Sequence, residues 1–293
     1  MADEQVKLTL VEKLGRVDRR IIFLLMGVAV LIPLLIHYTT TIPASLIVQD
    51  LFDKVESLPP GSKVLISFDY GPATEPENQP MATSITRHCF EKGLRIYMIS
   101  LWATGPRQAT ELIDGIITPE FPGKVYGIDW IDLGFKAGGQ GLINTLLSDF
   151  TAMYTTDVNG RAIAEFPMMA GIKSLRAFDL IYCVGSGQPG NKEWIQFAGD
   201  PGRIPVGGGT TAVMAPQLYP YYPKQTVGLL GGLQGAAEYE AALMVKYPKY
   251  KTMSRVASEK MGPQVSAHLV IAAFIILGNV TYLVERRRQK KRQ

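Results

Sequence analysis

KVLISFDY, residues Lys63–Tyr70, is a nearly continuous apolar run bounded by turn-forming residues. Pro59, Pro60 and Gly61 precede it, and the proline-rich stretch GPATEPENQP follows it. A run of this length and composition is typical of a strand that is buried on both faces of a parallel sheet. The stretch therefore predicts the first strand of an α/β domain.

The same pattern repeats along the chain on the C-terminal side. The further predicted strands are Leu94–Trp102, Val125–Phe135, Phe178–Gly187 and Arg203–Gly209. Helical patterns separate them, at Met81–Lys92, Pro106–Ile117, Gly141–Tyr154 and Asn191–Ala198. The last segment reads either as a glycine-rich helix, Gly228–Lys246, or as a glycine loop followed by a shorter helix that begins near Gln234. Residues 155–177 are less regular and read as an insertion with a short helix near Met168–Leu175. Alternating strands and helices predict a Rossmann-like three-layer α/β sandwich with a mostly parallel sheet.

Two long runs without formal charge flank this pattern, Ile21–Tyr38 and Val265–Val284. As helices with a rise of about 1.5 Å per residue, they reach about 27–30 Å, which is close to the thickness of a bilayer core. We therefore expect one N-terminal and one C-terminal transmembrane helix, with residues 39–262 forming the domain between them. Ile42–Leu58 has helical apolar spacing and predicts a short amphipathic helix at the membrane surface.

Basic side chains indicate the orientation of these spans. Eleven lie outside the two runs at the chain ends: Lys7, Lys13, Arg16, Arg19, Arg20, Arg286, Arg287, Arg288, Lys290, Lys291 and Arg292. By the positive-inside rule they place tails 1–20 and 285–293 in the cytoplasm and the domain in a periplasmic or extracellular space. Six basic residues on the domain side weaken this argument: Lys54, Lys246, Lys249, Lys251, Arg255 and Lys260. A cleaved signal peptide fits less well, because the first run is longer than a signal core of ~7–15 residues.

Other partners and cofactors have weak support in the sequence. The basic C-terminal tail reads as a stop-transfer signal, so membrane lipid is an expected partner and nucleic acid is not. GSGQPG (Gly185–Gly190) matches G-x-G-x-x-G, but it follows the fourth predicted strand, and Pro189 removes an amide donor. We expect no cofactor and no metal.

Cys89 and Cys183 read as two separate buried thiols, although a bridge between them stays open.

Two sets of residues are candidates for function. In an open parallel sheet, ligands bind at the carboxyl ends of the strands, which selects Asp69, Lys136, Ser186 and Thr210 as candidate ligand-binding residues. Glycines at helical spacing offer a smooth surface for close helix packing, and tyrosines are enriched in interfaces. The candidate interface residues are Gly228, Gly231, Gly232, Gly235, Tyr219, Tyr221 and Tyr222.

Three functions from different classes remain open. The first is a non-enzymatic structural or accessory subunit of a membrane complex, assembled as a homo-oligomer or with other membrane-complex subunits. The alternative is an extracytoplasmic ligand-binding or sensory domain that uses the strand ends. The third is a hydrolase of unrecognised type with Asp69 as its acid or nucleophile.

Overall fold

The structure is a computed structural model that describes residues 18–36 and 42–292. It contains two units, which we describe separately: an α/β unit, Thr41–Ser258, and a helical unit made of Met1–Thr40 and Glu259–Gln293.

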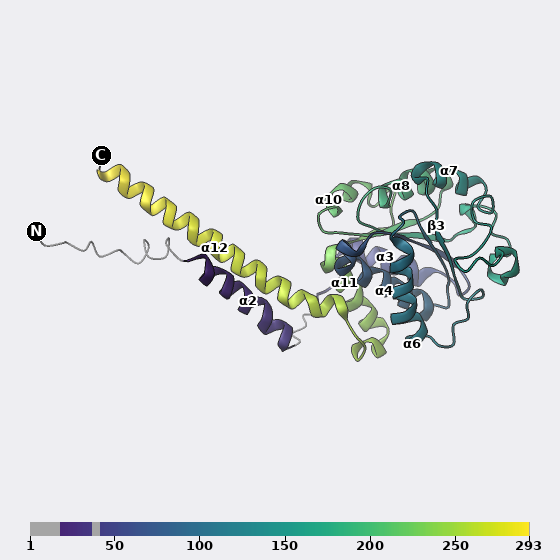
Figure 1. The fold of residues 1–293 in the computed structure, drawn as a ribbon, viewed down its shortest axis with the longest axis horizontal. Helices are drawn as coiled ribbons and strands as arrows, with labels where there is room; N and C mark the ends of the chain where they lie inside the picture. Colours follow the sequence, from purple (N-terminus) through teal and green to yellow (C-terminus); the bar gives the residue numbers. More distant parts are fainter. Residues whose placement is uncertain (1–17, 37–41, 293) are drawn as a thin grey trace, which may run out of the picture. The chain divides into compact units, whose positions relative to one another are not determined.

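A six-stranded sheet forms the centre of the α/β unit (Figure 1). Its strands are β1 (Lys63–Asp69), β2 (Arg95–Ser100), β3 (Trp130–Phe135), β4 (Leu180–Gly185), β5 (Val206–Thr210) and β6 (Gly228–Gly231). Their order is β3-β2-β1-β4-β5-β6, and every neighbouring pair is parallel. The predicted α/β fold is confirmed, and the sheet is parallel throughout.

Helices cover both sides of this sheet (Figure 1). The first side carries α3 (Leu46–Ser57), α4 (Glu75–Glu91), α5 (Gly105–Leu112) and α11 (Gly232–Lys246). On the second side, α7 (Gly139–Ser148) and a π-helical turn, Trp194–Gly199, pack on the core. The shorter helices are α6 (Thr118–Glu120), α8 (Asn191–Glu193), α9 (Asp200–Gly202) and α10 (Ala215–Leu218).

Alternate residues of each strand face the two helical layers. On β1, Leu65 belongs to the core on the α7 side, and its neighbours Val64 and Ile66 are equally buried. Burial on both faces explains why the strand sequence is apolar throughout rather than alternating. Cys183 lies in the α7-side core, whereas Cys89 lies in α4; both are buried and free, so the prediction of two separate thiols is confirmed.

Two helix predictions were wrong at their N-terminal ends. Helix α4 begins at Glu75 rather than Met81, because Pro76 lies in its first turn, where a missing N–H costs no hydrogen bond. The glycine-rich helix predicted from Gly228 begins at Gly232, and Gly228–Gly231 form the edge strand β6 instead. Gly232 has φ +61°, and a Cβ there would lie 2.8 Å from Cβ of Ala212, so this glycine permits a sharp turn from strand into helix.

The sequence had predicted that the segment of helix α3 lies at the membrane surface. Instead, α3 belongs to the α/β unit. Its apolar residues Val48, Leu51, Phe52 and Val55 are all buried. A Cβ on Gly228 would lie 2.4 Å from the carbonyl oxygen of Ile47, so α3 and β6 approach too closely for any side chain between them. The apolar side of α3 is therefore used in covering the sheet.

Two glutamates of α11 hold the first and the last helical turns of the α/β unit. Glu238 accepts hydrogen bonds from the backbone N–H (2.9 Å) and the hydroxyl (2.5 Å) of Ser45, directly before α3. Glu240 accepts from the backbone N–H of Ala257 (3.0 Å) and Ser258 (2.9 Å), and from the Ser258 hydroxyl (2.7 Å), in the first turn of α12 (Val256–Arg292). Both carboxylates are buried and occupy N-capping positions, where a helix leaves donors unpaired.

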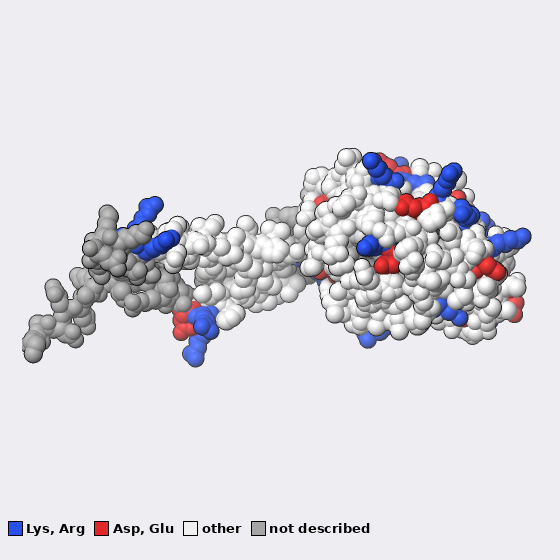
Figure 2. All heavy atoms as spheres, turned by 90° about the horizontal axis from the view of Figure 1, so that it is seen from above, with Lys and Arg blue, Asp and Glu red and all other residues white. Residues whose placement is uncertain are grey.

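The helical unit contains α2 (Arg19–Leu35) and the continuation of α12 (Val256–Arg292). Among the described residues, one helical segment, Val256–Val284, is long and apolar enough to cross a membrane. Its surface is almost free of charge, whereas charged side chains are scattered over the α/β unit (Figure 2). This indicates membrane association through α12. Helix α2 has 17 residues, and His37 and Tyr38 at the end of the first predicted span lie outside the described residues, so a second span and the orientation stay predictions.

The contacts of Glu240 predict a measurable loss of stability. Glu240→Ala leaves two buried N–H groups and a hydroxyl without an acceptor, so we expect the free energy of unfolding to fall by about 2 kcal/mol. Thermal unfolding of the full chain in lipid nanodiscs tests this. Val213→Ala, at an exposed position outside the contacts of Glu240, is the control and should change stability by less than about 0.5 kcal/mol. Equal stability of the two variants would show that the capping contacts are not made.

Candidate functional site

The order of the sheet reverses between β1 and β4, and the carboxyl ends of these strands form the position where open α/β sheets bind ligands. Asp69 of β1 pairs with Gly185 of β4, and Gly185 pairs with Thr210 of β5. Ser186 follows β4, and its N–H donates to the carbonyl of Asp69. The structure therefore brings Asp69, Ser186 and Thr210 to one level of this edge, and their role in ligand binding stays a prediction.

Asp69 has no free oxygen for a ligand. Its side chain is fully buried, and Oδ1 accepts a hydrogen bond from the backbone N–H of Leu101 (2.7 Å). Oδ2 accepts from Ser67 Oγ (2.8 Å), Trp194 Nε1 (2.9 Å) and Cys183 Sγ (3.3 Å). Burial raises the pKa of Asp69 from 3.8 to about 6, because the loss of hydration outweighs these four donors. Asp69 thus joins β1, β4, the end of β2 and the π-helical turn.

The crevice above Asp69 is closed by Trp102 and the GSGQPG loop. Trp102 Nε1 donates to the carbonyl of Pro189 (2.6 Å), and a Cβ on Gly187 would lie 3.0 Å from the Trp102 ring. The N–H of Gly190 donates to the Glu193 carboxylate (2.8 Å), so a negative charge already occupies this turn. A dinucleotide phosphate needs free amides at such a turn, and this loop has the opposite arrangement.

Thr210 lines a small cavity beside this loop, together with Asn191. The cavity has a volume of about 20 Å³, which is enough for one water molecule. Asn191 Nδ2 donates to the carbonyl of Gly209 (2.9 Å), whereas its buried Oδ1 has no hydrogen-bond partner among the described residues. This cavity accepts a water molecule rather than an organic ligand.

Lys136 lies further along the same edge, after β3. Its Nζ is 5.9 Å from the ring centroid of Tyr154. The Tyr154 side chain is fully buried, and its hydroxyl has no hydrogen-bond partner among the described residues. Burial raises the pKa of Tyr154, and the negative charges of Asp69 and Asp132 raise it further. Tyr154 therefore links the carboxyl edge of the sheet to the segment 149–179 that crosses from α7 to β4.

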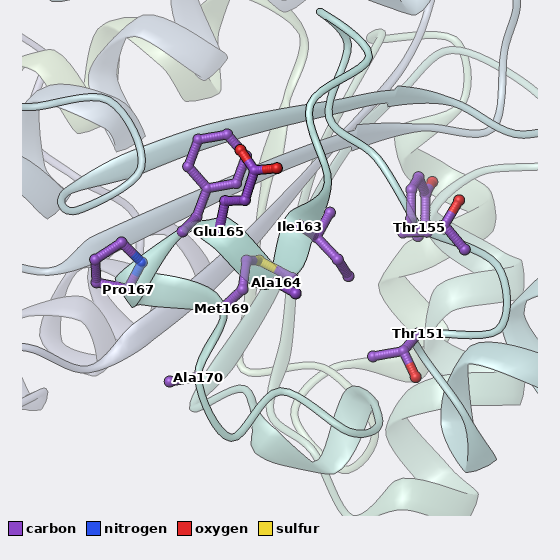
Figure 3. A pocket seen from close by; sticks show the side chains of 10 residues that line it. Thr151, Thr155, Ile163, Ala164, Glu165, Pro167, Met169 and Ala170 are labelled. Carbon is purple, nitrogen blue, oxygen red and sulfur yellow. The ribbon is translucent and has the colours of Figure 1, made fainter.

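This crossing segment contains an open apolar pocket of about 530 Å³ (Figure 3). Its buried lining residues are Tyr154, Ile163, Phe166 and Met169, and the exposed rim carries Thr151, Thr155 and Glu165. Figure 3 shows Thr151 and Thr155 on one side of the pocket and Glu165, Pro167 and Met169 on the other. Its size lies within the range of small-molecule sites, which are mostly apolar with a few polar groups. The sequence marked residues 155–177 only as an irregular insertion, and no motif pointed to a pocket there.

Ion pairs and ring contacts hold the loop beside this pocket. Asp157 is buried and accepts hydrogen bonds from the backbone N–H groups of Asn159 (3.0 Å) and Arg161 (2.8 Å) and from the Tyr126 hydroxyl (2.8 Å). The Arg161 guanidinium lies 4.7 Å from the Phe166 ring centroid and pairs with Asp157 at 3.2 Å. The pocket wall is therefore preformed rather than left to a loose loop.

The predicted interface glycines lie mainly inside the α/β unit. Gly228, Gly232 and Gly235 are buried, and a Cβ on Gly235 would lie 2.9 Å from the backbone of Leu230. A Cβ on Gly231 would lie 3.0 Å from Tyr219 Oη, and Tyr221 Oη accepts from Gln196 Nε2 (2.7 Å). The Tyr222 hydroxyl donates to the Asp50 carboxylate. Tyr219 is half exposed, so of these seven residues it offers the most free surface.

A second open groove lies between α3 and α11, with a volume of about 730 Å³. Its apolar lining includes Pro43, Phe52, Ala241 and Val245, and Val245 is 81% exposed. Asp53 and Glu56 of α3 and Lys246 of α11 complete the lining. The sequence had pointed to neither this groove nor its charged rim.

A buried histidine network lies behind this groove. His88 Nδ1 is 2.6 Å from Tyr239 Oη, and Nε2 is 3.1 Å from Glu56 Oε1. Burial lowers the pKa of His88 to about 4, although Glu56 opposes the shift. Partial burial raises the pKa of Glu56, but hydrogen bonds from Tyr247 and His88 and the charge of Lys92 outweigh it and hold the value at about 2. The network therefore holds a neutral imidazole at pH 7 and connects α3, α4 and α11.

The chain has no recognisable relative in the comparisons. No protein-family model matches it, and neither the curated proteins nor the solved structures contain a match. Within the described residues, no group of three His, Cys, Asp or Glu side chains is placed to hold a metal ion. Function is therefore argued from the geometry alone.

The raised pKa of Asp69 predicts a pH-dependent effect of Asp69→Asn. An acid whose folded pKa lies above its ordinary value stabilises the fold below pH 3.8, and that contribution is lost as the pH rises through 6. The stability advantage of the wild type over Asp69→Asn should therefore shrink by about 2 kcal/mol between pH 4 and pH 7.

Denaturant unfolding of both proteins at several pH values measures this difference. The lowered pKa of His88 acts in the opposite direction, since its contribution is present above pH 6.5 and is lost as the pH falls through 4. Both proteins contain His88, so its effect cancels in the comparison. A difference that stays constant or widens with pH would contradict the assignment.

Proposed function

We propose that this chain is a membrane-anchored binding protein whose α/β domain holds a small, mainly apolar ligand in the pocket lined by Tyr154, Ile163, Phe166 and Met169. The observation that carries the proposal is the pocket itself, an open volume of about 530 Å³ in the connection from α7 to β4. One lining residue, Tyr154, lies near Lys136 at the carboxyl edge of the sheet, which is the general position of ligands in this type of sheet.

The contrast with the sheet crevice supports binding in this pocket. Trp102 and the GSGQPG loop fill the position above Asp69, and the remaining cavity of about 20 Å³ is large enough only for a water molecule. The sequence had suggested a ligand held by Asp69, Lys136, Ser186 and Thr210. We propose the pocket in the segment 149–179 as the ligand site in place of these strand ends. Asp69 is a poor nucleophile for the hydrolase alternative, because both of its oxygens accept hydrogen bonds in a fully buried position.

The membrane arrangement is part of the proposal. Helix α12 supplies one span, and the apolar run Ile21–Tyr38 is proposed as the second. The basic residues at both chain ends support cytoplasmic tails and an extracytoplasmic domain. A ligand would then reach the pocket from the outer side of the membrane.

Binding of a neutral apolar probe tests the proposed function. With free 2-(1-naphthyl)ethanol at about ten times its Kd, we expect the melting temperature of the full chain in nanodiscs to rise by about 3–5 °C. Ala164→Phe places a ring in the pocket and should abolish the rise, whereas Ala73→Phe, exposed and outside the pocket, should keep it. Empty nanodiscs correct the free probe concentration for partitioning into lipid. An equal rise in both variants, or no rise in the wild type, would contradict binding in this pocket.

A second candidate function is self-assembly, and the α3–α11 groove favours it. The groove has an apolar floor and an exposed valine, Val245, and its rim charges Lys246 and Glu56 pair with each other at 3.5 Å within the chain. A second copy related by a two-fold axis would cover the apolar lining and the exposed Val245 of each chain with the same groove of the other, as an isologous interface requires. This groove replaces the glycines of α11 as the proposed interface, because those glycines contact their own domain.

Val245→Glu tests the assembly. The exposed Val245 would be desolvated at such an interface, so a glutamate there should convert a dimer into a monomer while the melting temperature stays within about 2 °C. The mass of the gently extracted wild-type and variant complexes is the measurement. Val213→Glu, equally exposed but outside the groove, is the control. A monomeric wild type, or an unchanged variant complex, would rule out this interface.

A further inference from the structure

We propose that the ligand of the pocket in the segment 149–179 carries a primary ammonium group on its apolar body, an inference that rests on the proposed function of that pocket. The hydrogen-bonding capacity of the pocket lining favours such a group. Four lining side chains have a polar atom: Thr151, Thr155 and Glu165 at the exposed rim, and Tyr154, whose hydroxyl is fully buried and is affected by the charges of Asp69 and Asp132. A carboxylate only accepts hydrogen bonds, and a hydroxyl whose proton is already donated elsewhere also only accepts.

The hydroxyl of Thr151 has already donated its proton and can therefore only accept hydrogen bonds from a ligand. Its Oγ1 donates to Asp149 Oδ1 at 2.9 Å, so its lone pairs remain for the pocket. Hydrogen bonds from Thr151 and from the backbone N–H of Ala152 hold the pKa of Asp149 below its usual range, so this carboxylate is charged at pH 7. The rim therefore presents acceptors at Thr151 and Glu165, with a second anion directly behind Thr151. A ligand that donates hydrogen bonds and carries positive charge complements this arrangement.

Nearby cations do not neutralise the negative charge at the pocket rim. Arg161 stacks on Phe166, but its charge is paired with the buried carboxylate of Asp157. Lys136 lies over the Tyr154 ring and does not line the pocket. Among the described lining residues, Glu165 is therefore the one with a charged side chain. An anionic ligand would meet Glu165 with no lysine or arginine beside it in the lining.

The apolar lining determines the size and polarity of the uncharged part of the ligand. Ile163, Phe166, Pro167 and Met169 present hydrocarbon, ring and thioether surface, and a volume of about 530 Å³ accommodates a bicyclic aromatic or a branched aliphatic amine. Methionine adapts to ligands of different outline, so the lining favours a chemical class rather than one shape. The expected class is thus a hydrophobic primary amine in its protonated form.

Three probes of nearly equal size test the charge preference. We would measure the affinity of the full chain in nanodiscs for 2-(1-naphthyl)ethylammonium, 2-(1-naphthyl)ethanol and 1-naphthylacetate at pH 7, with empty nanodiscs as the reference. The ammonium ion should bind about five-fold more tightly than the alcohol, and the carboxylate about five-fold more weakly, since an exposed charge pair contributes little more than this. Glu165→Gln should bring the affinities for the ammonium ion and the alcohol to within about two-fold of each other. Asp114→Asn removes an exposed carboxylate outside the pocket and should leave the preference unchanged.

The outcomes separate this inference from the proposed function. Equal affinity for the ammonium ion and the alcohol, both lost in Ala164→Phe, would overturn the ammonium preference and leave the pocket as a binding site. No binding of any probe would overturn both. A preference for the ammonium ion that persists in Glu165→Gln would show that Glu165 does not recognise the charge, which contradicts the role assigned to this side chain.

Discussion

The carboxylate of Asp69 is the interaction on which the arrangement of the sheet depends. It is fully buried at the end of the central strand β1, and four donors from different parts of the chain converge on it. Removing a carboxylate from water costs free energy, and this loss of hydration raises the pKa of Asp69. The donors offset it and fix where β2 ends, how close β4 lies and where the Trp194 ring packs. A residue at the usual ligand position of an open α/β sheet thus has a structural role here.

Closure of the crevice above Asp69 explains why the fold alone says little about function in this chain. The strand order resembles that of many nucleotide-binding domains, yet Trp102 and Glu193 occupy the positions that a cofactor and its phosphate would need. The open volume lies instead in the long connection from α7 to β4. Loops that vary on a rigid scaffold are where binding residues usually occur, and this crossing segment follows that rule.

The sequence predicted the centre of the fold better than its edges. Strands β1, β2 and β4 are long apolar runs, and burial on both faces leaves no other arrangement for them. The edge strand β6 is four residues long and begins and ends with glycine, so local propensity did not distinguish it from the helix that follows. Helix α3 has the spacing of an amphipathic helix, but spacing does not indicate whether a sheet or a lipid surface covers the apolar side. The pocket joins residues of three short turns whose packing depends on tertiary contacts, and the closure by Trp102 depends on a bond across 87 residues of chain.

Glu238 and Glu240 have a mechanical consequence. They lie two positions apart on α11, one bonded to Ser45 before α3 and the other to the first turn of α12, so both ends of the α/β unit are attached to the same helix. A pulling force applied through the two chain connections would be carried by α11 and its two carboxylates, and the parallel strands would bear little of it. The α/β unit is in this sense an insertion whose two ends meet at one helix. Such an insertion can be gained or lost as a whole without disturbing the segments that carry it.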